Sequence, residues 1–161
     1  MSQTLIPIAT QTGNGSATTI TFSSIPQTYT DLVLVMPIFT ASNANESVQI
    51  NGDTGSNYSN TWITGNGSTV ASSRNSNNTA LNIQTNIFST STSPAFHIMN
   101  FQNYSNTTTF KTVLTRSNRA EQATETFVGL WRNTAAITSI SIASATFTTN
   151  ATFTLYGIKA E

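Results

Sequence analysis

The 161-residue sequence contains no cysteine and little charge, and both features narrow the classes of protein to which it can belong. Without cysteine the chain forms no disulfide and suits either a reducing or an oxidising compartment. Charged residues make up 7% of the chain, and the formal net charge is zero. Because six scattered basic residues can neither neutralise many phosphates nor hold an anionic membrane, we expect no nucleic-acid and no membrane partner.

Long hydrophobic runs are also missing. The longest nearly unbroken apolar stretch covers residues 31–39, DLVLVMPIF, which is too short to span a membrane. The first residues lack the basic region and the long apolar core of a signal peptide, so the expected place of synthesis is a cytoplasm.

The stretch 31–39 is rich in β-branched residues and predicts a central β-strand rather than a helix. Leu32 and Leu34 occupy one alternating set of positions, and Val33 and Val35 occupy the other. Since both sets are apolar, we expect both faces of this strand to be covered. Pro37 cannot donate a ladder hydrogen bond and marks a bulge or the point where pairing on one edge stops.

Serine, threonine and asparagine together supply roughly two residues in five, where the usual surface would be rich in charge. Apolar residues recur in alternating segments of five to nine residues, about every ten positions, separated by Gly and Asn turns. No amphipathic helix of ten residues occurs. The pattern predicts an all-β fold in which residues 1–161 form a single-domain antiparallel β-sandwich of about ten strands, jelly-roll-like in topology.

Residues 68–93 are weakly patterned, with few apolar residues among many Asn and Ser. This segment could form edge strands, long surface loops or an inter-subunit surface, and the sequence leaves the three open.

The sequence offers little for catalysis. The single histidine, His97, has no carboxylate or second histidine nearby in the sequence, so a metal site or a catalytic base would need partners from far away. Asp31 and Asp53 are expected to bond to turn amides, although residues 51–55 could alternatively offer oxygens to calcium. A P-loop, a nucleophile elbow and a dinucleotide fingerprint are absent. We therefore expect no catalytic residues, no metal, no cofactor and no enzyme activity.

Aromatic residues held on strands are the remaining candidates for a binding site, because a rigid aromatic face can stack on a sugar ring. Trp62, Trp131 and Tyr156 fit this description, and Trp131 is assigned to the core. Tyr58 and Trp62 are the predicted contact residues for a glycan or a protein partner.

Four segments carry a resemblance to a known group of proteins: YTDLVL at 29–34, VQINGDTGSNYS at 48–59, GLWRNTAAITSISI at 129–142 and LYGI at 155–158. Together they resemble small virion proteins of tailed bacteriophages, particularly those of cyanobacteria and aquatic bacteria. In that group such domains occur as capsid decoration (cement) proteins and as distal parts of tail fibres. The resemblance therefore implies a place on the virion surface, and it supplies no binding residues.

The chain has no coiled or triple-β shaft, which favours the decoration protein. We expect it to bind the major capsid protein on the phage head as a homotrimer of jelly rolls and to stabilise the shell. The alternative is a tail-fibre tip that recognises host polysaccharide through Tyr58 and Trp62. A third reading, a sugar-cleaving depolymerase, would require activity that depends on Asp31, Asp53 or Glu125, and we expect none.

Overall fold

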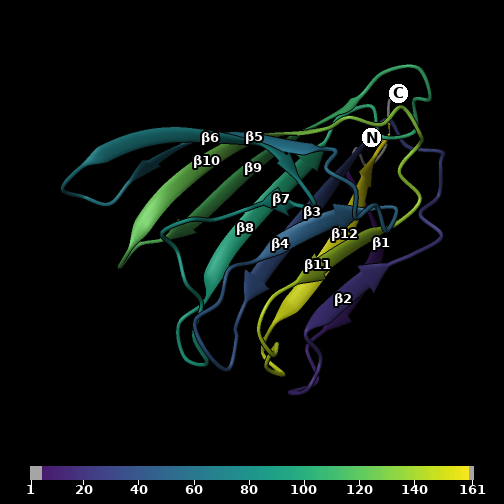
Figure 1. Cartoon of the computed structure of the whole chain (residues 1–161). Coiled ribbons are helices and arrows are strands. Elements are labelled where there is room, and N and C mark those ends of the chain that lie inside the picture. The colour runs from purple at the N-terminus through teal and green to yellow at the C-terminus, as the bar shows by residue number, and fades with distance from the viewer. Residues whose placement is uncertain (1–4, 160–161) are drawn as a thin grey trace.

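The computed structural model describes residues 5–159, which form twelve β-strands and no helix (Figure 1). In chain order the strands are β1 Leu5–Thr12, β2 Thr19–Phe22, β3 Asp31–Ile38, β4 Ser47–Ile50, β5 Tyr58–Gly65, β6 Val70–Asn78, β7 Leu81–Asn82, β8 Ala95–Phe101, β9 Lys111–Arg119, β10 Ala123–Trp131, β11 Ile140–Ala143 and β12 Thr152–Ile158. The prediction of an all-β chain is confirmed. Within these residues no helix is long and apolar enough to cross a membrane.

The strands form two antiparallel sheets. The larger sheet has the order β1-β12-β3-β8-β9-β10-β5-β6, and the smaller has the order β2-β11-β4-β7. Four nested pairs, β1 with β12, β2 with β11, β3 with β8 and β4 with β7, are hydrogen-bonded and alternate between the sheets. One long antiparallel hairpin wrapped over two sheets gives this pattern, which is that of a jelly roll. The predicted β-sandwich is therefore present.

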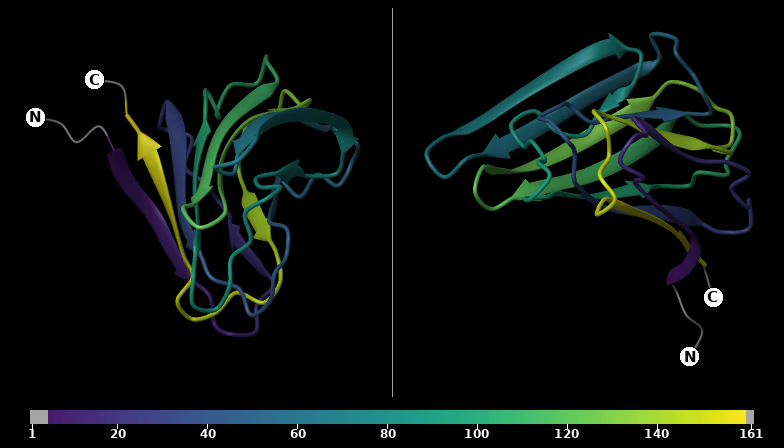
Figure 2. Two further views of the ribbon diagram at one scale, coloured as in Figure 1. Left: turned by 90° about the vertical axis from the view of Figure 1, so that its left-hand side faces the viewer. Right: turned by 90° about the horizontal axis from the view of Figure 1, so that it is seen from below.

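Two hairpins are added to this eight-stranded jelly-roll core. The β5–β6 hairpin is inserted between β4 and β7, and the β9–β10 hairpin between β8 and β11. Both join the larger sheet beyond β8, in the order β9-β10-β5-β6. We call these four strands the extension. Figure 2 shows the β5–β6 hairpin curling away from the plane of β3 and β8.

The hydrophobic core lies between the two sheets, and every second residue of the central strand β3 points into it. Leu32, Leu34, Met36 and Ile38 of β3 are fully buried on the inner face. Fully buried aromatic side chains belong to the same core cluster: Tyr58, Phe101, Tyr104, Trp131, Phe147 and Phe153. Trp131 is 1% exposed, so its assignment to the core is confirmed.

The opposite face of β3 differs from the expectation. Val33, Val35 and Pro37 are only half-buried, because nothing in residues 5–159 forms a second layer over this side of the larger sheet. Pro37 lies where pairing on one side ends, as predicted: β12 pairs with β3 up to Val35, and β8 continues to Ile38. The outer face of the larger sheet is thus a partly apolar surface that faces solvent.

The two edges of the larger sheet are unlike each other. The edge strand β1 contains Pro7 and a bulge between Pro7 and Ala9, both of which discourage pairing with another chain. The edge strand β6 contains no proline, and most of its residues are exposed on both faces. The weakly patterned segment 68–93 therefore contains a true edge strand, the short strand β7 and the loop that follows it.

Asparagine side chains build many of the turns, which helps to explain the composition. The Oδ1 atoms of Asn14, Asn66 and Asn106 each accept hydrogen bonds from the backbone N–H groups two and three residues later. Such Asx turns replace backbone hydrogen bonds at strand ends without introducing charge.

Candidate functional site

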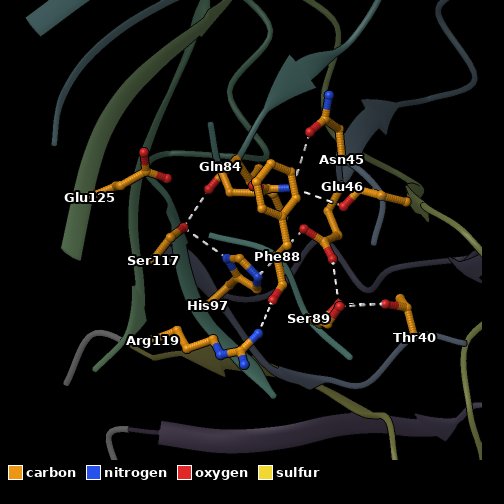
Figure 3. A network of polar contacts seen from close by, with 12 residues as sticks. Thr40, Asn45, Glu46, Gln84, Phe88, Ser89, His97, Ser117, Arg119 and Glu125 are labelled. Atoms are coloured by element: carbon orange, nitrogen blue, oxygen red, sulfur yellow. Dashed lines mark hydrogen bonds and ion pairs between the residues drawn. The ribbon is translucent and has the colours of Figure 1, made fainter. Parts of the chain in front are cut away.

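A cluster of polar side chains is buried between β8, β9 and the loop after β7 (Figure 3). His97 on β8 lies between Ser117 on β9 and Glu46, the residue before β4. The His97 Nδ1 atom is 2.8 Å from Ser117 Oγ, and His97 Nε2 is 4.0 Å from Glu46 Oε2. Ser89 donates a 2.9 Å hydrogen bond to Glu46 Oε1 and is itself bonded to Thr40. We call Glu46, His97, Ser117 and Ser89 the buried polar cluster.

The hydrogen bonds determine where the protons of this cluster lie. The Ser117 hydroxyl donates to the carbonyl of Ile83, so its oxygen is left to accept the Nδ1–H of His97. The lone pair of His97 Nε2 then faces Glu46 Oε2. The two atoms are 4.0 Å apart, which is beyond hydrogen-bond distance, and neither has another hydrogen-bond partner among the described residues.

Burial decides the charge state of the pair. It raises the pKa of Glu46 to about 7, against the opposing effect of the Ser89 hydrogen bond. Burial also lowers the pKa of His97 to about 3. Although 4.0 Å would permit an ion pair, both side chains are fully buried, and separating charge there costs more than the attraction returns. Glu46 and His97 are therefore both neutral in mildly acidic solution.

Ser117, His97 and Glu46 have the composition of a serine-hydrolase triad, but their arrangement is enclosed. All three side chains are buried, and the Ser117 hydroxyl is already donated to the Ile83 carbonyl. A serine nucleophile must be accessible to its substrate and must be able to pass its proton to the base. The buried Ser117 hydroxyl meets neither requirement. What the cluster does is to hold the loop 83–94 against β8 and β9 through polar contacts.

A second buried carboxylate fixes the same loop from the extension. Glu125 on β10 accepts hydrogen bonds from the backbone N–H groups of Thr85 and Asn86 and from both of their side chains, at 2.5–3.2 Å. Arg119 donates to the Phe88 carbonyl, and Gln122 Oε1 accepts the Phe88 N–H at 2.7 Å. The loop is thus held by side chains of β9 and β10, which sequence patterning could not reveal.

Asp31 and Asp53 bond to turn amides, as predicted. Asp31 accepts the N–H of Asn103 at 2.6 Å. Asp53 accepts hydrogen bonds from the Gly55 N–H, the Asn57 side chain and the Trp131 Nε1–H. Burial acts to raise the pKa of Asp53, but these donors outweigh it and lower the pKa below its ordinary value. A calcium ion at residues 51–55 would have to compete with those N–H donors.

The two predicted contact residues differ in accessibility. Tyr58 is fully buried, and its hydroxyl donates to the carbonyl oxygens of Ile50 and Asp53. This corrects the expectation for Tyr58, which has no ring face to offer a ligand. Trp62 is half-buried and stacks on Phe127, with ring centroids 5.7 Å apart and planes 24° from parallel. Trp62 remains available as a contact at the concave side of the extension.

Sequence reasoning missed an exposed apolar surface on the extension. Leu114, Val128 and Ile63 are 38%, 47% and 51% exposed, and all three lie on the outer face of the extension. Leu114 is directly opposite Val128 on the neighbouring strand. The alternation of β9 and β10 contained this signal, because each strand carries an apolar residue among the polar residues of its outward-facing set.

These features define an all-β jelly-roll protein with an enlarged sheet. No family model matches the chain, and no curated protein sequence matches it. Within residues 5–159, no group of three or more histidine, aspartate or glutamate side chains is placed to hold a metal ion.

Proposed function

We propose that the chain is a decoration (cement) protein of a tailed-bacteriophage head. In this proposal it binds the major capsid protein at the virion surface as a homotrimer and stabilises the shell. The observation that carries the proposal is the exposed, partly apolar outer face of the larger sheet, which in a free protein leaves large side chains in water. The jelly-roll core supplies a rigid support for such a face.

The distribution of polar groups supports a binding role. Three buried titratable side chains, Glu46, His97 and Glu125, belong to the contacts that hold the loop 83–94. The surface is made largely of hydroxyl and amide groups, whose hydrogen bonds to a partner depend little on salt.

The experiment is to mix purified protein with emptied phage heads and to count bound copies by mass spectrometry against the shell protein. We expect stoichiometric attachment and hundreds of copies on a virion. A handful of copies per particle would contradict a decoration role and favour a fibre. Sedimentation of the free protein at several concentrations tests the trimer, and a monomer at all concentrations would contradict it.

A second candidate function, a tail-fibre tip that recognises host polysaccharide, is favoured by Trp62 alone. Its indole stacks on Phe127 and is half-buried, as a sugar-binding platform would be. A glycan array with the wild-type protein and Trp62→Ala tests it. Specific binding that is lost in the variant would favour the fibre tip over the decoration protein.

A further inference from the structure

The outer face of the extension combines exposed apolar side chains with two arginines that have no partner among residues 5–159. Two rows of side chains run across the four strands, and we call these eight residues the outer patch. The first row is Leu114, Val128, Thr61 and Arg74, and the second is Arg116, Thr126, Ile63 and Ser72.

The two arginines of the outer patch occupy opposite corners of it. Neighbouring strands lie about 4.8 Å apart, and residues two apart on a strand are separated by about 6.8 Å. Arg74 on β6 and Arg116 on β9 are therefore three strand spacings and one step of two residues apart, with apolar residues between them. Arginine is enriched among the residues that contribute most to binding energy in protein interfaces, and such residues lie next to apolar contacts.

The arginines of the chain divide into two groups. Arg119 pairs with Glu121 and donates to the Phe88 carbonyl, and Arg132 donates to Ser59, Ser56 and Asn77. Within the part of the chain that the structure describes, Arg74 and Arg116 make no hydrogen bond or ion pair. Both free guanidinium groups thus lie on one face of a surface that carries very little other charge.

The carboxylates of the described residues favour a partner other than a second copy of the chain. Glu46 and Glu125 are buried, and Glu121 pairs with Arg119. Asp31 and Asp53 accept hydrogen bonds from backbone or side-chain donors. Among residues 5–159 every carboxylate is buried, ion-paired or hydrogen-bonded, and this favours a different protein as the source of the complementary charge.

We propose that the outer patch binds a different protein, at a surface that carries carboxylates on both sides of an apolar centre. Arg74 and Arg116 pair with the carboxylates, and Leu114, Val128 and Ile63 pack on the apolar centre. Naming that partner as the shell protein rests on the proposed function. Arg74 on the edge strand also discourages edge-to-edge pairing, but Arg116 lies on an internal strand where that need does not arise.

The first test is independent of the phage. The full chain, labelled with ¹⁵N, is titrated with a synthetic peptide of four Val-Glu repeats and with a Val-Lys peptide of the same length. We expect the Val-Glu peptide to shift the amide signals of Leu114, Arg116 and Val128, and the Val-Lys peptide to leave them unchanged. Raising the salt from 50 to 500 mM should weaken the binding several-fold.

The Arg74→Gln/Arg116→Gln double variant should bind the Val-Glu peptide about tenfold more weakly. Lys159→Gln is the matched control, because it removes an exposed cation outside the outer patch and should leave the binding unchanged. Equal binding by wild type and the double variant, equal shifts with both peptides, or shifts confined to other strands would overturn the proposal. Self-association that the double variant abolishes would identify a second copy as the occupant and would also overturn it.

The second test uses emptied heads. Attachment by the wild type that falls about tenfold in the double variant, but not in Lys159→Gln, supports the shell as the partner of the outer patch. If the wild type does not attach while the Val-Glu peptide still binds, the proposed function is wrong and the inference about the patch stands. Attachment that is equal in all three proteins would overturn the patch as the docking surface.

Discussion

The jelly-roll core and the extension are built from the same antiparallel strands but distribute their apolar side chains differently. In the core, β3 buries four residues completely on its inner face under the smaller sheet. In the extension, the outer face keeps Leu114, Val128 and Ile63 in solvent, and polar side chains hold the loop 83–94 over the inner face. The comparison teaches that one sheet can bury its aliphatic side chains in one part and leave them in solvent in another.

The largest expected difference between the two regions is the cost of removing an aliphatic side chain. Leu34→Ala in β3 should lower the free energy of unfolding by about 3 kcal/mol, because it leaves a cavity in a closely packed core. Val128→Ala on the extension should change it by less than about 0.5 kcal/mol, because the side chain is already in water. Denaturant unfolding of both variants measures the two values, and equal costs would contradict the division of roles.

Two glycines give a matched pair for the same comparison. A Cβ atom on Gly157 of β12 would lie 2.3–2.5 Å from the ring of Tyr29, whereas one on Gly129 of β10 would lie 2.8 Å from a methyl group of Leu81. The rigid ring cannot move aside, but the leucine can change rotamer. We expect Gly157→Ala to cost about 3 kcal/mol and Gly129→Ala about 1 kcal/mol, measured by thermal unfolding. A larger cost at Gly129 would reverse the comparison.

The core's buried pair makes stability depend on pH in a defined way. In the folded state one proton is held by the pair between the pKa of His97, about 3, and that of Glu46, about 7. With model values of 4.5 for Glu46 and 6.5 for His97, the unfolded pair holds two protons below pH 4.5, one between pH 4.5 and 6.5, and none above. The contribution of the pair to the free energy of unfolding is therefore greatest, and independent of pH, between pH 4.5 and 6.5.

Below pH 4.5 the unfolded pair binds the extra proton, so stability falls by about 2 kcal/mol on reaching pH 3. Above pH 6.5 the folded pair holds one proton more than the unfolded pair, so the free energy of unfolding falls as the pH rises. This decrease is smaller and stops at the folded pKa of Glu46, about 7. In Glu46→Gln only His97 remains, so stability should already decline as the pH falls below 6.5. Unfolding in denaturant at half-unit pH steps tests this, and identical profiles for the two proteins would refute the assignment.

A local effect is expected at the extension's own buried carboxylate. Glu125 receives four hydrogen bonds from Thr85 and Asn86, and Glu125→Gln replaces one acceptor oxygen by an NH₂ group that faces donors. We expect a loss of about 1.5 kcal/mol, seen as faster amide exchange in the loop 83–94. Thr124→Ser, at an exposed position next to it, is the control and should leave the exchange unchanged. Loop exchange that is equally slow in Glu125→Gln would show that apolar packing holds the loop.

The sequence predicted the fold better than the site, for a physical reason. Period-two alternation and regularly spaced turns allowed the β-sandwich to be read from the sequence. In β3 both alternating sets are apolar, so the sequence did not show which set faces the core. His97 and Glu46 are far apart in the sequence and meet only because β8 lies beside the loop before β4 in the folded chain. The sequence pattern around Tyr58 does not reveal which groups its hydroxyl contacts. Only the fold shows that this hydroxyl is hydrogen-bonded to the backbone of Ile50 and Asp53.

The most direct test of the whole account is hydroxyl-radical footprinting of the protein, free and attached to emptied heads. We predict that attachment lowers oxidation of Leu114, Val128 and Ile63, and leaves Leu5 and Phe110, which are exposed outside the outer patch, as reactive as before. Protection confined to the smaller sheet, or unchanged oxidation of the outer patch in the attached protein, would contradict the assignment of recognition to the extension.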